Sequence, residues 1–280
     1  MRKNNIDMRI LIITNGSSQN NKALKFCAPF VRFAGDSIRL LIAVDNISGK
    51  ILPSFDSFLE FAQETLGIPN LHTRVRIGQL YKEILNECRE GEYDLVIMGD
   101  QQVHRSTYFF LKPLTVRLAE VIQCSVLLVV GKINPVRHIL LCDSGAGHAS
   151  TLNRFSSQWV NLLDGGQEIT VLHVMSQISA GPGVRGKQLR ACTEELIAEH
   201  TPEGDLLERD VQLLRDSGFR STPKVRHGLV VDEILTEAQS GDYDLVVIGA
   251  HHFGGWQGLL LDDVAQKIIM RLDRPVLIIK

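Results

Sequence analysis

The sequence predicts an α/β protein that contains two copies of a five-stranded, mostly parallel sheet flanked by helices. Three observations lead to this fold class. The second half of the chain repeats the first, strand-length apolar runs alternate with longer amphipathic segments, and those runs lack the polar alternation of half-exposed strands. With 280 residues, of which 44% are hydrophobic and 22% are charged, the chain is long enough for two domains with buried cores.

The internal repeat is the strongest signal in the sequence, because three segments recur at a constant spacing of 150 residues (225 − 75). The matching segments are V-R-I-G and V-R-H-G at 75–78 and 225–228, E-I-L-N-E and E-I-L-T-E at 83–87 and 233–237, and G-E-Y-D-L-V-I-M-G and G-D-Y-D-L-V-V-I-G at 91–99 and 241–249. We therefore expect two copies of one domain, fused head to tail.

The spacing between the copies also locates an insertion and the domain boundary. The first strands, which begin near Ile10 and Ile139, are only 129 residues apart (139 − 10), so the second copy carries extra residues. We place them within 178–220, where a glycine-rich stretch precedes a charged helical stretch. The predicted domains are residues 1–133 and 134–280, joined by a short, turn-prone connection.

The elements of the first copy follow from its apolar spacing. Strands are expected at Ile10 to Thr14, Ser37 to Val44, Thr73 to Ile77, Leu95 to Met98 and Val126 to Val130. Between the third and fourth of these, Leu80, Ile84, Leu85 and Cys88 keep the helical i, i+4, i+5, i+8 spacing, which predicts a helix over 79–89. In such a sheet, ligands bind beyond the carboxyl ends of the strands. These ends carry Asn15 and Asp143, Val44 and Val174, and the loops that start at Gly99 and Gly249.

Charge and cysteine content exclude several classes of function. Thirty basic and thirty-two acidic residues give a formal charge of −2, which is too balanced for a phosphate-backbone binder, so we expect no nucleic-acid partner. No apolar run reaches the ~18 residues of a membrane-spanning helix, and no export signal is expected. The five cysteines are scattered and never spaced as C-x-x-C, which is typical of a cytoplasmic protein without a disulfide framework.

A specific resemblance lies in the second copy, at D-L-V-V-I-G-A-H-H-F-G-G-W-Q-G-L-L-L-D-D-V-A, residues 244–265. This segment resembles the signature of universal stress proteins, in which the fourth strand leads into G-x2-G-x9-G-[S/T] and then a helix. The repeated V-R-x-G and E-I-L segments and the terminal P-V-L-I-I, residues 275–279, are similar to the same family. The resemblance implies a tandem protein with a Rossmann-like fold, pairing through the last strand, and ATP or AMP binding in some members but not in others.

Both copies depart from the phosphate-binding part of that signature. In the second, Gly249 opens the motif, but His252 replaces its second glycine and Asp262-Asp263 replaces the closing pair. In the first, Gln102 and Lys112-Pro113 stand at these places. Glycine-rich turns bind phosphate through consecutive backbone N–H groups, proline has none, and a carboxylate repels the ligand. At an effective dielectric of 20 and a separation of ~4 Å, that repulsion costs about 4 kcal/mol. The acidic pair instead has the chemistry to cap its own helix.

The nucleoside part of the site is better kept in the second copy. Asp143 matches the aspartate that binds the base in the family, whereas the first copy has Asn15 or, without an alignment gap, Thr14. The candidate cofactor-binding residues are Asp143, Val174, Gly249, His251, Gly254 and Gly255. The resemblance implies ATP or AMP as a ligand of the second domain, and the sequence does not require any cofactor.

Other motif-like strings do not define a site. Gly181 to Gln188 nearly matches G-x4-G-K-[S/T], but Gln188 lacks the hydroxyl that binds magnesium, which favours a loop of the insertion. His251 and His252 have no acidic or cysteine partner nearby in the sequence, so no metal is assigned. No G-x-S-x-G elbow is present, and no catalytic residue is assigned.

These observations favour a non-catalytic, cytoplasmic stress-response protein whose two domains form an internal pseudo-dimer with degenerate phosphate-binding loops. It acts through an unknown protein partner or by weak nucleotide sensing. The alternative is an ATP/AMP-binding switch that uses the second domain, and an adenine-nucleotide hydrolase is a third hypothesis. Association into homo-oligomers stays open.

Overall fold

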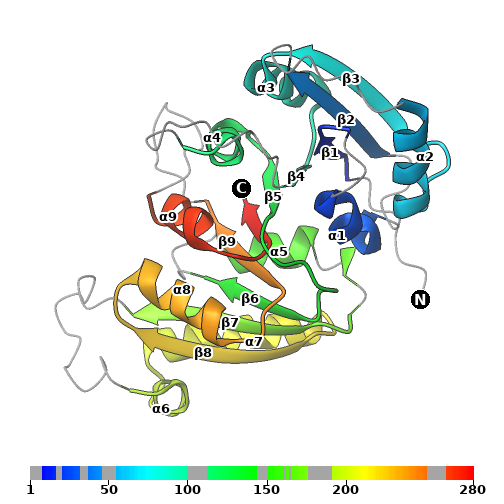
Figure 1. Cartoon of the computed structure of the whole chain (residues 1–280). Helices are drawn as coiled ribbons and strands as arrows, with labels where there is room; N and C mark the ends of the chain where they lie inside the picture. The colour runs from blue at the N-terminus through cyan, green and yellow to red at the C-terminus, as the bar shows by residue number, and fades with distance from the viewer. Residues whose placement is uncertain are drawn as a thin grey trace. The chain divides into compact units, whose positions relative to one another are not determined.

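The computed structural model describes residues 8–16, 21–31, 37–45, 55–99, 112–143, 151–159, 162–163, 165–175, 191–250 and 263–280. Most of the chain divides between Asn134 and Pro135 into two compact units, the first unit and the second unit (Figure 1). Each has an α/β fold, as predicted. No helix in the described ranges is long and apolar enough to cross a membrane.

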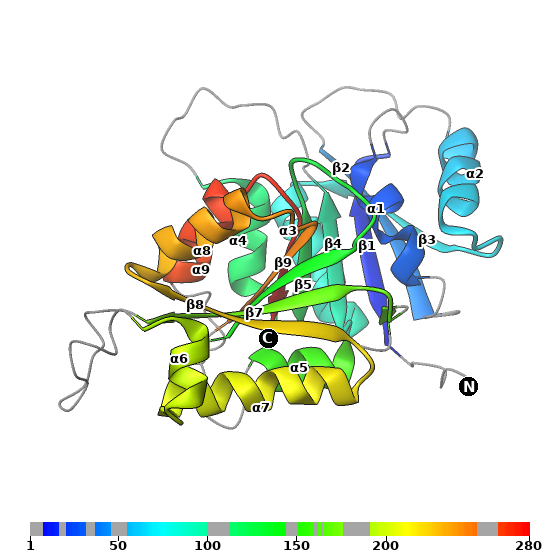
Figure 2. The same ribbon diagram turned by 90° about the horizontal axis from the view of Figure 1, so that it is seen from below.

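The sheet of the first unit has the strand order β3-β2-β1-β4-β5, and all its neighbouring strands are parallel. Its strands are β1 (Ile10–Thr14), β2 (Ile38–Asp45), β3 (His72–Gly78), β4 (Leu95–Gly99) and β5 (Ser125–Val129). Its helices are α1 (Lys22–Val31), α2 (Phe55–Leu66), α3 (Leu80–Gly91) and α4 (Leu114–Val121). Helix α1 packs against α2 and α3 packs against α4, so one pair of helices covers each face of the sheet (Figures 1 and 2).

The second unit repeats this arrangement with the strand order β8-β7-β6-β9-β10, again parallel throughout. Its strands are β6 (His138–Cys142), β7 (Glu168–Met175), β8 (Arg220–His227), β9 (Leu245–Gly249) and β10 (Val276–Ile279). Its helices are α5 (Thr151–Gln158), α6 (Thr193–Ala198), α7 (Pro202–Asp216), α8 (Val230–Ser240) and α9 (Asp263–Arg271). Helices α5 and α7 cover one face, and α8 and α9 cover the other (Figure 2).

Strand register shows which residues of the two units are equivalent. Ile10 pairs with Leu95 in the first unit, and Ile139 pairs with Leu245 in the second, so the first strands are offset by 129 (139 − 10). The second strands are offset by 131 (169 − 38) and the third by 150 (222 − 72). Most of the inserted residues therefore lie between β7 and β8, within the range expected from the sequence.

The insertion adds α6 to the second unit and ties it to α7. Thr201 caps the start of α7, where its hydroxyl accepts a hydrogen bond from Gly204 N–H at 3.1 Å. A Cβ atom at Gly204 would lie only 2.1 Å from the carbonyl oxygen of Leu196, so only glycine allows the two helices to approach this closely. Leu196 in turn packs on Met175 at the carboxyl end of β7.

Burial explains why the sequences of the central strands are continuous apolar runs. All five residues of β1 are buried, because the helices of the first unit cover both faces of this central strand. The outer strands differ: Ile77 of β3 is 61% exposed, and β8 contains Pro223, which cannot donate a ladder hydrogen bond. The exposed Ile77 and Pro223 thus lie on strands that have one neighbour within their unit.

Candidate functional site

The candidate site of the second unit lies at the carboxyl end of β6, where Asp143 follows the strand directly. Asp143 is 5% exposed, and its backbone N–H donates to the carbonyl oxygen of Leu172 in β7 at 3.2 Å. Its Oδ2 accepts a hydrogen bond from the backbone N–H of Leu152, in the first turn of α5, at 3.3 Å. Asp143 therefore satisfies a backbone N–H group in the first turn of α5 that has no partner within the helix.

Gly249 ends β9 beside the same turn of α5. A Cβ atom at this position would lie 2.1 Å from Oγ1 of Thr151, so the close approach of β9 to the helix requires glycine. The structure thus brings Asp143 and Gly249 together around the start of α5. Val174 is half-buried near the end of β7, one residue after His173, whose Nδ1 donates to the carbonyl oxygen of Asp143 at 3.3 Å.

The remaining predicted site residues lie outside the part of the chain that the structure describes. They are His251, Gly254 and Gly255. The near-match to a P-loop at 181–188 is outside it as well.

Asp210 of α7 is a site residue that the sequence analysis missed. It is 3% exposed, and its carboxyl group is close enough to Asp143 for the two charges to interact. Burial raises the pKa of Asp210 to about 6, and the charge of Asp143 adds to the rise, although Arg209 Nη2 donates to Oδ1 at 3.4 Å. The signal was present in the sequence, because Asp210 lies in the apolar stripe of α7 formed by Leu207 and Leu214.

The pH dependence of stability tests this environment. Because the pKa of Asp210 is raised in the folded state, its stabilising contribution is fully present below 3.8, the ordinary value, and is lost as the pH rises through about 6. We expect Asp210→Asn to raise the free energy of unfolding by about 2–3 kcal/mol at neutral pH and to leave it unchanged below about pH 4. Urea denaturation at a series of pH values measures both.

A matched control for this prediction is Glu208→Gln, which removes an exposed carboxylate from the same helix. This variant is expected to change stability by less than about 0.5 kcal/mol at every pH. A gain in Asp210→Asn that does not vary with pH would contradict the shifted pKa.

The first unit has no carboxylate at the equivalent position. The offset of 129 between the first strands aligns Asp143 with Thr14 rather than Asn15, which decides between the two alignments considered above. Thr14 is buried, and its Oγ1 accepts a hydrogen bond from Nδ2 of Asn21 at 2.5 Å. Asn21 Oδ1 then accepts from the backbone N–H of Leu24 at 3.4 Å. In the first unit, two neutral side chains joined by a hydrogen bond therefore cap the start of α1. In the second unit, a single carboxylate caps the start of α5.

The second strands also align one residue away from the correspondence expected from the sequence, which matched Val44 with Val174. Val174 pairs with Arg226, and its equivalent in the first unit is Ala43, which pairs with Arg76. Ala43, not Val44, therefore stands in the position of Val174.

The described residues of the phosphate-binding loops carry ordinary helix-end chemistry. Asp263 begins α9 and accepts a hydrogen bond from Lys267 Nζ at 2.5 Å, one turn further along the helix. Lys112 Nζ lies 2.6 Å from Oε1 of Glu120, an ion pair that occupies the lysine. Pro113 directly precedes α4, as its N-cap residue. These contacts stabilise the helices themselves.

Comparison with known proteins places this geometry in a family. The model of the universal stress protein family matches residues 8–130 and, a second time, residues 137–280. The chain belongs to the universal stress protein family. Universal stress protein MJ0577 of Methanocaldococcus jannaschii is 26% identical over 125 residues, which cover 41% of this chain and 77% of that protein.

Solved tandem structures match this universal stress protein over almost its whole length. A putative universal stress protein from Pseudomonas aeruginosa UCBPP-PA14 has a TM-score of 0.63 and 16% identity, with 98% of this chain and 93% of that chain covered. A universal stress protein from Archaeoglobus fulgidus DSM 4304 has a TM-score of 0.60 and 15% identity, with 97% and 95% covered. At these identities the likeness concerns the fold.

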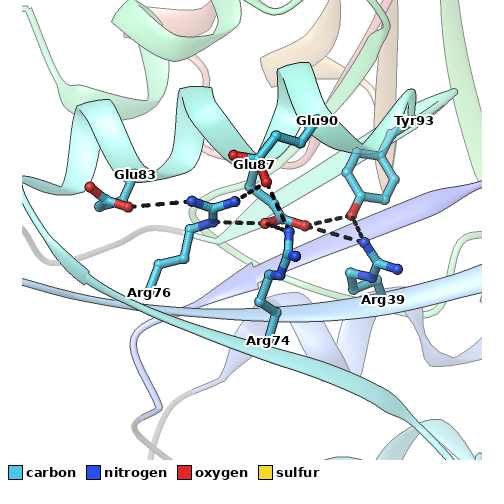
Figure 3. Close-up of polar contacts among 7 residues, drawn as sticks. All are labelled: Arg39, Arg74, Arg76, Glu83, Glu87, Glu90 and Tyr93. Atoms are coloured by element: carbon cyan, nitrogen blue, oxygen red, sulfur yellow. Dashed lines mark hydrogen bonds and ion pairs between the residues drawn. The ribbon is translucent and has the colours of Figure 1, made fainter.

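Each half of this universal stress protein also holds a buried glutamate with cationic partners, away from the carboxyl ends of the strands. In the first unit, Glu87 of α3 has a fully buried side chain (Figure 3). Its Oε2 accepts hydrogen bonds from Arg74 Nη1 at 2.9 Å and Arg76 Nε at 2.8 Å. Its Oε1 accepts from Tyr93 Oη at 2.8 Å and from Arg39 Nη1 at 3.5 Å.

The second unit repeats this arrangement around Glu237 of α8, at the offset of 150. Oε1 of Glu237 accepts hydrogen bonds from Lys224 Nζ and Tyr243 Oη, both at 2.8 Å, and Oε2 accepts from Arg226 Nη1 at 3.2 Å. Burial and the neighbouring carboxylate raise the pKa of Tyr243 to about 12, so its hydroxyl remains a donor. The recurrence of glutamate at 87 and 237 is visible in the sequence, but it does not reveal that the side chains are buried.

Proposed function

We propose that this universal stress protein is a non-catalytic, cytoplasmic stress-response protein that senses adenine nucleosides and nucleotides weakly through its second domain. In this proposal its response passes to a protein partner, and the two domains, residues 1–133 and 134–280, act as an internal pseudo-dimer with degenerate phosphate-binding loops. The observation that carries the nucleotide part is the buried Asp143 at the carboxyl end of β6, which only the second unit has.

The chemistry of Asp143 supports recognition of a base. A carboxylate accepts hydrogen bonds, and the exocyclic amino group of adenine donates them. One oxygen of Asp143 accepts from Leu152 N–H, which fixes the orientation of the carboxyl group at the edge of the sheet. Thr14 in the first unit is instead engaged by Asn21, and a hydroxyl offers no charge to the ligand. The proposed site includes Val174 and Gly249, with His251, Gly254 and Gly255 from the residues that follow Ala250 in the sequence.

The chemistry of the phosphate-binding loop explains why the proposed sensing is weak. The motif of the second domain lacks its second glycine and ends in Asp262-Asp263, so the phosphates gain little from binding. Adenosine, AMP and ATP should therefore bind with affinities within about tenfold of one another, a difference of about 1.4 kcal/mol. Isothermal titration of the purified chain with each ligand measures this.

Asp143→Asn tests whether Asp143 binds the adenine base. The amide keeps the size of the carboxyl group but replaces an acceptor with an NH₂ donor, which would face the amino group of adenine. We expect adenosine affinity to fall by about tenfold or more, since a buried hydrogen bond to a charged group contributes about 1.5–3 kcal/mol. Asn15→Ala, a change in the first unit, is the control and should leave the affinity unchanged.

The same titrations separate the proposal from its alternative. If ATP binds more than about a hundredfold more tightly than adenosine, the second domain is an ATP/AMP-binding switch with a working phosphate loop. Release of inorganic phosphate from ATP by the purified protein would identify a hydrolase. Adenosine affinity that is equal in Asp143→Asn and in the unaltered chain would remove Asp143 from the site.

A further inference from the structure

A cavity of about 660 Å³ lies in the second unit at the opposite end of the strands from Asp143. His138, Glu168 and Arg220, which begin β6, β7 and β8, lie at its rim. Lys224, Glu237 and Tyr243 of the buried glutamate arrangement line it as well. The cavity therefore belongs to the second unit alone and is independent of the proposed nucleotide site.

The first unit shows which group fits this place. Thr170, which lines the cavity, occupies the register position of Arg39, because Thr170 follows Ile169 in β7 as Arg39 follows Ile38 in β2. The Arg39 guanidinium lies against the buried glutamate of its own unit, with Nη1 3.1 Å from Tyr93 Oη (Figure 3). In the second unit, a hydrogen bond from Thr170 to Tyr243 takes over this contact, but the threonine side chain is too short to fill the volume of an arginine side chain.

Glu237 of the second unit also accepts fewer hydrogen bonds than Glu87 of the first unit. The contacts described above give Glu87 four hydrogen bonds and Glu237 three, and each carboxylate oxygen has two lone-pair directions. The side chain of Glu237 is only 1% exposed. Water therefore screens its charge little, and the charge attracts a cation in the cavity strongly. The second unit thus retains the anion and the tyrosine of the arrangement without the third cation.

A second substitution adds negative charge at the rim. Glu168 begins β7 at the register position of Ser37 in the first unit, so the second unit has gained a carboxylate next to the missing arginine. Glu168 Oε1 pairs with Arg220 Nη2 at 2.9 Å, but the arginine side chain is 75% exposed. The other oxygen of Glu168, Oε2, lies 3.5 Å from Nε2 of His138, whose side chain is also exposed. Exposed pairs of this kind are weak and exchange readily, so an incoming cation can compete for Glu168.

The basic residues of the wall do not favour an anion. Lys224 is bound to Glu237, and Arg215 Nη2 donates to the carbonyl oxygen of Ser221 at 3.1 Å, so of the three lysine and arginine side chains of the wall only the exposed Arg220 can exchange its partner. An anion at Lys224 or Arg215 would have to displace one of these partners, whereas a cation would meet the carboxylates of Glu237 and Glu168.

We propose that this cavity binds a small guanidinium compound, of the class of free arginine or agmatine, whose cation occupies the place that Arg39 fills in the first unit. A planar guanidinium offers several N–H donors at fixed angles, which suits a tyrosine hydroxyl and two carboxylates better than an ammonium group does. The cavity volume exceeds that of one side chain, which leaves room for the rest of a free amino acid.

Titration of the whole protein with L-arginine tests the proposal, with L-citrulline as the matched ligand because it replaces the guanidinium by a neutral ureido group of nearly the same shape. We expect one arginine per chain and citrulline binding at least about tenfold weaker, since charge-assisted hydrogen bonds are about twice as strong as neutral ones. Equal binding of the two ligands, or binding of inorganic phosphate in place of arginine, would overturn the proposal.

Reciprocal substitutions use one unit as the control for the other. Thr170→Arg supplies the guanidinium internally and should abolish arginine binding, whereas Arg39→Thr should open an equivalent site in the first unit and raise the stoichiometry to about two per chain. Glu168→Ser, an exposed change, should weaken arginine binding by about threefold to tenfold and covers the case in which Thr170→Arg does not fold. Arginine binding that is undiminished in Thr170→Arg, or in Glu168→Ser if only that variant folds, would refute the assignment.

Discussion

Replacing Glu87 with glutamine is expected to lower the free energy of unfolding by about 3–5 kcal/mol, because removal of one partner leaves buried or half-buried cations without their counter-charge. Arg74 and Arg76 both donate to the carboxylate, and so does Tyr93, which lies between α3 and β4. Glutamine offers one acceptor oxygen and directs an NH₂ group at the arginines. Urea denaturation followed by circular dichroism measures the change.

The pH dependence of this effect follows from the pKa of Glu87. Burial alone would raise it, but the hydrogen bonds from Arg74, Arg76 and Tyr93 lower the pKa from 4.5 to about 2. A lowered folded-state pKa gives stability that is present above 4.5 and is lost as the pH falls through about 2. The difference between the unaltered chain and Glu87→Gln should therefore shrink over that range and remain constant above it.

The control for this variant is Glu90→Gln on the same helix. Glu90 also pairs with Arg74 and Arg76, but its side chain is 53% exposed, so its removal should cost less than about 1 kcal/mol. If the two variants are equally stable, the buried carboxylate does not organise the three cations. The comparison needs both proteins at the same pH and salt concentration, because exposed pairs are screened.

Replacing Phe155 with alanine is expected to cost about 3–5 kcal/mol of unfolding free energy, through the lost burial and the cavity that remains. Phe155 is 1% exposed and is the largest fully buried side chain of α5. The same helix donates Leu152 N–H to Asp143 and places Thr151 beside Gly249. Adenosine affinity should therefore fall together with stability, and both can be measured on the same sample.

Gln158→Ala provides the matched control, because Gln158 is an exposed residue one turn further along α5. This change should alter stability by less than about 0.5 kcal/mol and leave adenosine binding intact. A destabilised Phe155→Ala protein that binds adenosine with full affinity would show that α5 does not position the site.

Much of the fold could be predicted because buried parallel strands have a simple pattern. The run from Ile10 to Ile13 is apolar throughout, and the structure places it, with Thr14, at the centre of its sheet as β1. The helix expected over 79–89 is α3, whose ends differ by one or two residues. Exposed strands such as β3 follow the pattern less well, since Arg74 and Arg76 belong to an ion-pair arrangement rather than to the core.

The site was harder to predict because its important features are contacts between distant segments. The identity of the position equivalent to Asp143 depended on strand register, which only the pairing of β1 with β4 and of β6 with β9 reveals. Asp210 lies on α7, and its place next to Asp143 depends on packing between segments that are far apart in the sequence. The cavity at Thr170 arises because threonine stands where the first unit has the longer side chain of Arg39. The residue type at one position does not show how much space surrounds it in the fold.

Pro223 has a consequence for how the protein behaves when its concentration is high. Outer strands with free N–H and carbonyl groups invite edge-to-edge stacking with further chains, which leads to fibres and precipitates. Because a pyrrolidine ring interrupts the donor row of β8, the margin of the second unit is a poor template for such stacking. Pro223 therefore lowers the tendency of the protein to aggregate through the outer edge of β8.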